Sequence, residues 1–194
     1  MAKTYRYISV DIEASGTFTP DYSMLSVGAV DLETKDEFYA ELKPLGKNTN
    51  PDSMKVVGIP LKHFEENGSD PREAMQRFAD WLEAHRANKD QELLLVAFNA
   101  PFDWQFVNYY FLKFLGKCPF GYSCVDAKAF WLGLRSTQKE ATWTDTQKSR
   151  LPKRIQSQLK HTHHALEDAR EQADVFQNML KEAERIRKGE KPEE

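Results

Sequence analysis

The sequence predicts an α/β fold with a mixed sheet, and three features predict it. Residues 7–13, 24–32 and 37–42 have the pattern of strands, and the short connections between them indicate an antiparallel meander. Residues 93–98 form a continuous apolar run bounded by polar residues, which is typical of a strand covered on both faces. Residues 164–187 carry apolar residues spaced by alternating threes and fours, which predicts a long amphipathic helix. The chain therefore begins with antiparallel strands and continues with strands and helices in turn.

The composition fits one well-buried domain in a reducing compartment. Of the 194 residues, 40% are hydrophobic and 29% are charged, which is enough for a single α/β core. The formal net charge is only −3, so any contact with nucleic acid must come from a local basic patch. Cys118 and Cys124 have no metal-type spacing with the histidines, and so few cysteines indicate a reducing compartment.

Neither end of the chain shows a targeting or membrane segment. The N-terminus lacks the apolar run of a signal peptide, and no later segment approaches the length of a membrane span. Residues 185–194 are nearly all charged, so we expect one domain over residues 1–184 and a frayed tail after it. Together these features predict a soluble protein of the cytoplasm with no membrane contact.

The first strand carries two acids on one face. Alternation along residues 7–13 puts three aliphatic side chains on one side and Asp11 and Glu13 on the other. Two such acids lie about 7 Å apart and repel each other unless something positive lies between them. A pair of divalent cations is a candidate, but the same pattern is common on solvated strand ends. The pair alone does not decide between a site and a surface.

The middle of the chain predicts one well-marked helix. Residues 43–68 are rich in Pro, Gly and Asn and predict at most short helices around residues 51–57 and 60–66. Asp70 then provides an N-cap, with Pro71 in the first turn and Glu73 three positions after the cap. The apolar face of this helix comprises Ala74, Phe78, Trp81, Leu82 and His85.

A second helix, over residues 101–115, places an acid among apolar residues. Asn99 or Ala100 lies near its N-cap, and Pro101 lies in its first turn. Asp103 shares a face with three apolar residues at i+4, i+7 and i+11. A carboxylate in that setting costs several kcal/mol unless it is paired or metal-bound.

The segment from residue 122 to residue 160 predicts a short strand over residues 122–125, a helix over 126–134 and a short helix over 149–159. Basic residues also gather here around Trp143, which is typical either of a solvated surface or of a groove for a phosphate backbone. These basic residues are Arg135, Lys139, Lys148, Arg150, Lys153, Arg154 and Lys160.

The last helix carries the remaining candidate acid. Asp168 lies on its flank beside apolar residues, so it points partly toward packed surface. Three histidines, His161, His163 and His164, crowd the segment before it. Single histidines are mostly packing or surface residues, but three beside a half-buried acid favour a site. Ideal helix geometry would put His164, at i−4, beside Asp168.

These motifs resemble the DEDDh family of 3′-to-5′ exonucleases, which includes ribonuclease T, oligoribonuclease and the proofreading subunit of bacterial DNA polymerase III. Residues 11–16 (DIEASG) resemble the first motif, residues 99–103 (NAPFD) the second and residues 163–169 (HHALEDA) the third. The three motifs occur in order and on the expected strand, helix and helix. The resemblance spans roughly residues 5–180.

The resemblance implies a ribonuclease-H-like fold, with a mixed five-stranded sheet and helices on both faces. It implies two Mg²⁺ or Mn²⁺ ions held by Asp11, Glu13, Asp103 and Asp168, and oxygen ligands suit such hard cations. It also implies that His163, rather than His164, is the general base, a role that suits an ordinary histidine pKa.

For the substrate, the resemblance implies contacts in the first and second motifs. We expect the amides of Ala14, Ser15 and Gly16, and the Ser15 hydroxyl, to touch the terminal nucleotide. Asn99 of the second motif is a further candidate contact. Phe18, Met24 and Phe102 could stack on bases or lie in the core. The loop over residues 16–23 departs from several relatives. The family includes dimers, so a homodimer in which residues 135–160 feed the partner's site is also expected.

The sequence thus predicts a metal-dependent 3′-to-5′ exonuclease that hydrolyses single-stranded 3′ ends of DNA or RNA to nucleoside 5′-monophosphates. One alternative is a nucleic-acid-binding or polymerase-accessory module with little activity of its own. Another is a small-molecule phosphohydrolase that uses the same metals. The sequence does not distinguish DNA from RNA, because a contact to the 2′-hydroxyl needs coordinates.

Overall fold

A computed structural model describes residues 4–88, 90–138 and 140–190 and contains one five-stranded sheet. The central strand is β1 (Thr4–Ala14), and the strand order is β3-β2-β1-β4-β5. The other strands are β2 (Met24–Asp31), β3 (Glu37–Glu41), β4 (Gln91–Ala97) and β5 (Cys124–Asp126). β1, β2 and β3 pair antiparallel, whereas β1, β4 and β5 pair parallel. The predicted mixed sheet and its antiparallel start are therefore confirmed.

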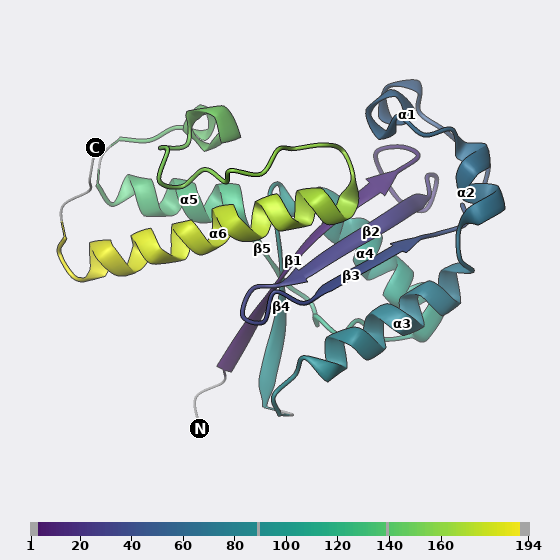
Figure 1. The fold of residues 1–194 in the computed structure, drawn as a ribbon, viewed down its shortest axis with the longest axis horizontal. Coiled ribbons are helices and arrows are strands. Elements are labelled where there is room, and N and C mark those ends of the chain that lie inside the picture. Colours follow the sequence, from purple (N-terminus) through teal and green to yellow (C-terminus); the bar gives the residue numbers. More distant parts are fainter. Residues whose placement is uncertain (1–3, 89, 139, 191–194) are drawn as a thin grey trace.

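Helices cover both faces of this sheet (Figure 1). On one face, α3 (Pro71–Ala84) and α4 (Ala100–Leu115) pack on the aliphatic side of β1. On the other face, α5 (Ala127–Ser136) and α6 (Ala165–Arg187) form a second core. The short helices α1 (Pro51–Val57) and α2 (Leu61–Asn67) lie beyond the carboxyl end of β1 (Figure 1). Since Asp11 and Glu13 project from the face opposite the α3 and α4 core, they lie on the side of α6.

Local capping explains where the two helices of the first face begin. The Asp70 carboxylate accepts hydrogen bonds from the amides of Arg72 and Glu73, at 2.9 and 3.2 Å, as the sequence predicts for α3. Before α4, Asn99 adopts a left-handed backbone (φ 83°) and does not cap the helix with its side chain. The Asp126 carboxylate accepts from the Ala100 amide instead, at 2.7 Å.

The predicted helix over residues 149–159 is wrong. The chain forms two short 3₁₀ turns before and at the start of this range, η1 (Trp143–Thr146) and η2 (Lys148–Arg150), and only turns after them. Leu151 precedes Pro152 and is extended (φ −62°, ψ 141°), because a proline disfavours the helical conformation in the residue before it. The segment that links α5 to α6 is therefore irregular.

The last helix extends to Arg187, into the segment predicted as a charged tail. Lys188 follows it and pairs with Glu184 at 3.0 Å. Residues 191–194 of that tail, and Lys139 of the basic segment, lie outside the described residues. Over the described ranges, no helix has the length and apolar character that crossing a membrane requires.

Candidate active site

A cavity of about 290 Å³ opens at the carboxyl end of β1. The parallel pairing of β1 with β4 ends at Ser9 and Val96, so the two strands part just before the first acid. The four acids predicted as metal ligands all line this cavity: Asp11, Glu13, Asp103 and Asp168. The parting of two parallel strands thus creates the space in which three distant motifs meet.

The two strand acids are held close to the acid of α6. Carboxylate oxygens of Asp11, Glu13 and Asp168 lie within 4.8 Å of one another. Burial, and then the nearby charges of Asp168 and Asp103, raise the pKa of Glu13 to about 8. Burial also raises the pKa of Asp11 well above its usual range, helped by Asp103, Glu13 and Asp168. In the absence of a cation, this arrangement favours protonated carboxyls.

Asp103 reaches the same cavity from the first turn of α4. Its side chain is only 4% exposed, as the helical pattern predicts. Its Oδ1 accepts a hydrogen bond from the amide of Ile12 at 3.1 Å, on the edge of β1 where β4 no longer pairs. Burial raises the pKa of Asp103 to about 8 despite this bond.

Asp168 is fully buried and anchors the loop before α6. Its two oxygens accept from the amides of Thr162 and His163, at 2.8 and 2.9 Å. His163 reaches this position with a left-handed backbone (φ 58°), which lets the loop wrap around the carboxylate. The loop is therefore held mainly by one acid side chain.

His163 and His164 have different surroundings. His163 is exposed and lines the cavity. The His164 ring stacks on Tyr39 with centroids 4.7 Å apart and is not among the lining residues. His161, which the sequence placed in the histidine cluster without a role, also lines the cavity, and its Nδ1 lies 3.1 Å from Asp168 Oδ2. The geometry supports the family spacing over ideal helix spacing, since His163 and not His164 reaches the acids.

A glycine lets α6 approach the strand acids. Gly28 pairs with Asp11 across β1 and β2. A Cβ at this position would lie 2.3 Å from the Leu166 nitrogen and 2.4 Å from the Ala165 carbonyl. Only a glycine allows the first turn of α6 to lie this close to the sheet. An isolated glycine inside a strand signals such an approach, but the sequence does not say what approaches.

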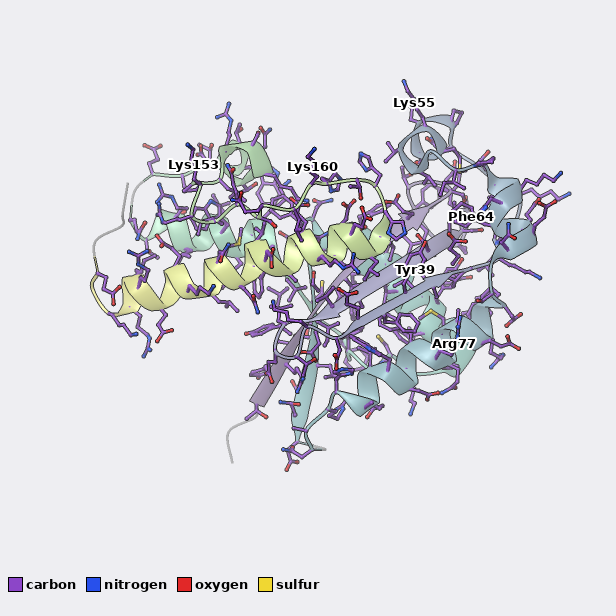
Figure 2. All side chains as sticks on the ribbon, in the orientation of Figure 1. Tyr39, Lys55, Phe64, Arg77, Lys153 and Lys160 are labelled. Atoms are coloured by element: carbon purple, nitrogen blue, oxygen red, sulfur yellow. The ribbon has the colours of Figure 1, made fainter. Side chains whose placement is uncertain are left out.

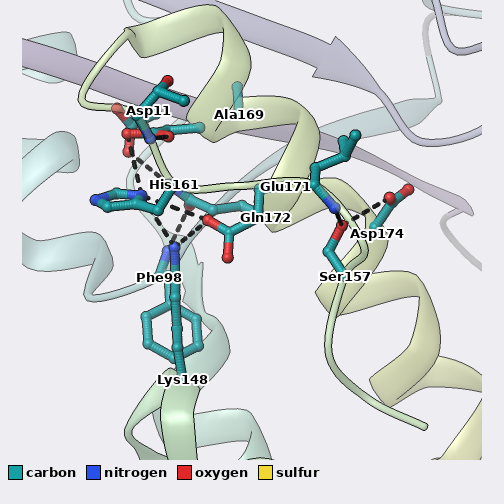
Figure 3. Close-up of polar contacts among 12 residues, drawn as sticks. Asp11, Phe98, Lys148, Ser157, His161, Ala169, Glu171, Gln172 and Asp174 are labelled. Atoms are coloured by element: carbon teal, nitrogen blue, oxygen red, sulfur yellow. Dashed lines mark hydrogen bonds and ion pairs between the residues drawn. The ribbon is translucent and has the colours of Figure 1, made fainter. Parts of the chain in front are cut away.

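Polar side chains of α6 tie the helix to the site (Figure 3). Gln172 donates from Nε2 to Asp11 Oδ1, and its Oε1 accepts from the Phe98 amide at 2.7 Å. Glu171 pairs with Lys148 of η2, so this lysine turns inward. Neither glutamine nor glutamate was predicted, although Gln172 lies four residues after Asp168 and therefore on the same face of α6.

The predicted substrate contacts divide into two groups. Ala14, Asn99 and Phe102 line the cavity. The other four are engaged elsewhere and are not among its lining residues: Ser15, Gly16, Phe18 and Met24.

Each of these four residues has its own structural contact. The buried Ser15 hydroxyl donates to Asn48 O and accepts from the Ser23 amide, both at 2.9 Å. A Cβ on Gly16 would lie 2.1 Å from the Tyr22 ring. The half-exposed Phe18 packs edge-on against Tyr22, and Met24 is fully buried.

An apolar wall from α1 completes the cavity and was not predicted. Ser53, Val56 and Val57 line it, and the Val56 side chain is half-exposed. Figure 2 shows Lys55 on the same helix and Lys160 on the loop leading to α6. Both lysines are exposed. Within the predicted basic segment, by contrast, Arg154 pairs with Glu182 at 2.7 Å.

The donor set fits hard divalent cations. Closely spaced carboxylates with raised pKa values become favourable when a cation neutralises them. Oxygen-only donors suit Mg²⁺ or Mn²⁺ better than they suit a structural zinc. Asp11, Glu13, Asp103 and Asp168 could therefore hold metal ions. A second group within 4.8 Å adds nitrogen donors, since it comprises His161, His163 and Asp168.

Comparison with known proteins identifies close relatives by sequence. A family model described as a 3′-5′ exoribonuclease Rv2179c-like domain matches residues 6–180. The 3′-5′ DNA exonuclease Cap18 of Escherichia coli is 38% identical over 180 residues. This match covers 92% of the chain and 94% of Cap18.

Solved structures show the same fold at low sequence identity. The nuclease domain of 3′hExo, a DEDDh family member bound to rAMP, has a TM-score of 0.65 and 12% identity, covering 95% of this chain and 92% of that one. Escherichia coli exonuclease I with a dT13 oligonucleotide has a TM-score of 0.68 and 15% identity, covering 96% of this chain but 43% of that one. The chain also spans 64% or less of several other solved neighbours. The ribonuclease-H-like fold implied by the motifs is confirmed.

Proposed function

The chain belongs to the 3′-5′ exoribonuclease Rv2179c-like family of DEDDh exonucleases, and from this premise we propose how it acts. It removes nucleotides one at a time from single-stranded 3′ ends and releases nucleoside 5′-monophosphates. Two divalent cations, Mg²⁺ or Mn²⁺, bind Asp11, Glu13, Asp103 and Asp168, and His163 is the general base. The observation that carries this proposal is the meeting of those acids and His163 around one cavity.

The chemistry follows from the positions of the side chains. When bound, the cations would offset the negative charge of the phosphate and of the leaving oxygen. The exposed His163 imidazole accepts the proton of the attacking water, because its backbone is fixed on Asp168 beside the acids. The water oxygen bonds to phosphorus as the bond to the 3′ oxygen breaks. That oxygen takes up a proton and becomes the new 3′-hydroxyl of the shortened strand.

The walls of the cavity suit a terminal nucleotide. Phe102 and the α1 wall offer apolar surface to a base or sugar. Lys55 on α1 and Lys160 on the opposite loop offer charge to a phosphate backbone (Figure 2). With a net charge of −3, local lysines of this kind are what the protein has available for electrostatic attraction.

The descriptions of the relatives include both DNA and RNA as substrates. Cap18 is named a DNA exonuclease, whereas the family model is described as exoribonuclease. We propose single-stranded DNA or RNA as substrate, and matched oligonucleotides of both kinds test it. Equal rates would mean that no contact reads the 2′-hydroxyl, and a large difference would identify the preferred substrate.

The decisive experiment is a hydrolysis assay with purified protein, Mn²⁺ and a 5′-labelled oligonucleotide with an unpaired 3′ end. We expect a ladder that shortens by single nucleotides and is lost in Asp11→Ala. Asp80→Ala, on the outer face of α3 and bonded to Gln76, is the matched control. Tight binding without hydrolysis would instead identify a binding module. Cleavage of mononucleotide esters but not of oligomers would identify a phosphohydrolase.

The homodimer and the role of residues 135–160 in a partner's site are part of this proposal. Lys148 and Arg154 are engaged within their own chain, with Glu171 and Glu182. Among the described lysines of that segment, this leaves exposed Lys153 and Lys160 able to reach outward (Figure 2). Light scattering after size-exclusion chromatography measures the mass directly. A monomer would exclude a site shared between subunits.

A further inference from the structure

We infer that Gln172 is a positioning residue for Asp11: its amide fixes the rotation of the Asp11 carboxylate and thereby sets the affinity of the site for divalent cations. This inference rests on the proposed function, because it assumes that Asp11 is a metal ligand. Gln172 lies outside the three motifs and comes from the second turn of α6. Figure 3 shows it between Asp11 and Phe98.

The contacts of Gln172 leave its amide a single orientation. The Phe98 backbone N–H can only donate, so the acceptor end, Oε1, must face it, at 2.7 Å. The donor end, Nε2, must then face Asp11, where it donates to Oδ1. The side chain is only 4% exposed, so water does not compete for these bonds. The Gln172 side chain therefore accepts a hydrogen bond from the backbone amide of Phe98 and also orients the Asp11 carboxylate.

The position of this bridge matters because β1 and β4 separate here. Pairing ends at Ser9 and Val96, and Phe98 lies just beyond the end of β4. Gln172 spans the gap from α6 and links the two strand ends through its amide. One turn earlier on α6, the Ala169 carbonyl accepts a hydrogen bond from the Ser9 hydroxyl at 2.8 Å, and this bond fixes the position of the helix relative to β1. The bond from Gln172 to Asp11 is thus held in place by contacts of α6 with β1 and with the end of β4.

An uncharged donor is what this position requires. Asp11 already faces the charges of Glu13, Asp103 and Asp168. A glutamate in place of Gln172 would add another like charge, whereas a lysine would compete with the metal for the carboxylate. An amide orients Asp11 without changing the charge of the site. Partners that orient metal ligands in this way are typically worth about 10- to 100-fold in metal affinity.

The test compares Mn²⁺ binding by isothermal titration calorimetry in three proteins. Gln172→Met keeps the length of the side chain but removes the donor and the acceptor. Gln177→Met is the matched control, because Gln177 also links α6 to the sheet region, through Leu32 O and Lys35 Nζ, both at 2.6 Å, away from the cavity. We expect Mn²⁺ to bind Gln172→Met about 10- to 100-fold more weakly than wild type. The control should bind as wild type does.

A kinetic readout separates positioning from general damage. If Gln172 acts through the metal, the lost hydrolysis rate should recover as Mn²⁺ is raised toward saturation. Circular dichroism and thermal unfolding show whether the variant is folded. Should Gln172→Met fail to fold, Gln172→Asn takes its place, since it keeps an amide but is one methylene too short to bridge.

Each outcome separates the inference from the proposed function. Wild-type affinity in a folded Gln172 variant overturns the inference and leaves the proposed metal site intact. An equal loss in Gln177→Met also overturns it, because the effect would then be a loosening of α6. If the wild-type protein binds no Mn²⁺, the proposed function fails, and the inference fails with it.

Discussion

The cavity is built from two halves that differ in burial and in backbone. In the sheet half, Asp11, Glu13 and Asp103 project from a central strand and a capped helix, and buried surroundings raise the pKa of each. In the loop half, His161 and His163 are exposed on an irregular segment. His163 has a left-handed backbone that is held by hydrogen bonding to a side chain rather than by a strand or helix.

This difference assigns different tasks to the two halves. A cation strongly stabilises a closely spaced, desolvated set of carboxylates, so the sheet half suits metal binding. An exposed imidazole exchanges protons with water readily, so the loop half suits proton transfer. Asp168 belongs to both halves. It lies with the strand acids, and its carboxylate also accepts hydrogen bonds from two backbone amides of the loop.

The strongest test of the sheet half is Asp11→Asn. We expect hydrolysis to fall on the order of 10³-fold or more, since the loss of a ligand removes several kcal/mol of charge stabilisation. Without metal, the variant should be at least as stable as wild type, because a buried carboxyl with a raised pKa is replaced by an amide that cannot become charged. Initial rates and thermal unfolding measure both effects. A variant that keeps its rate would break the assignment of metal binding to the sheet half.

The loop half is tested by comparing two adjacent histidines. His163→Ala should lower single-turnover hydrolysis by about 10²-fold or more, as the loss of a general base does. His164→Ala should have a mild effect, because its ring packs on Tyr39. Mn²⁺ affinity should stay near wild type in both. The opposite ranking of rates would remove His163 from the mechanism.

The close approach of α6, which carries Asp168, to the sheet is tested at Gly28. Gly28→Ala places a methyl group 2.3 to 2.4 Å from backbone atoms of Ala165 and Leu166 in α6. These contacts are too short, so the helix must move away from the sheet. We expect a loss of about 1–3 kcal/mol in urea unfolding and weaker hydrolysis, since Asp168 moves with the helix. Gly133→Ala is the control, because no atom lies within 4 Å of its Cβ. If Gly28→Ala is as stable and active as wild type, α6 can shift without harm to the site.

The pH dependence of metal-free stability tests the burial of the acids in the sheet half. The pKa values of Glu13 and Asp103 are about 8 in the folded protein, against ordinary values of 4.5 and 3.8. The folded state thus binds more protons than the unfolded state between these values, so this contribution is full below about pH 4 and is lost as pH rises toward 8. Asp103→Asn should flatten the fall of the melting temperature over that range. An unchanged slope would show that burial does not hold Asp103 protonated.

Local patterns predicted most of the fold and the acids of the site. The periodicity of the first strand and the apolar faces around Asp103 and Asp168 depend on neighbours in sequence, and the structure has these residues buried as expected. Gln172 and the α1 wall were missed because their importance comes from contacts between segments far apart in the sequence. The histidine cluster was noticed, but nothing in the sequence assigned His161 a role of its own. Ser15 illustrates the same limit, since its hydroxyl bonds to Asn48, which the small-residue pattern does not reveal.

The first strand and the last helix meet within the site, through the bonds from Ser9 to Ala169 and from Gln172 to Asp11. These partners are 160 and 161 residues apart, so the contacts that complete the cavity close a loop nearly as long as the chain. During synthesis, a chain still lacking α6 carries Asp11, Glu13 and Asp103 but neither Asp168 nor Gln172. The nuclease centre therefore forms only after the chain through Gln172 has left the ribosome, and a product truncated before α6 carries no complete centre.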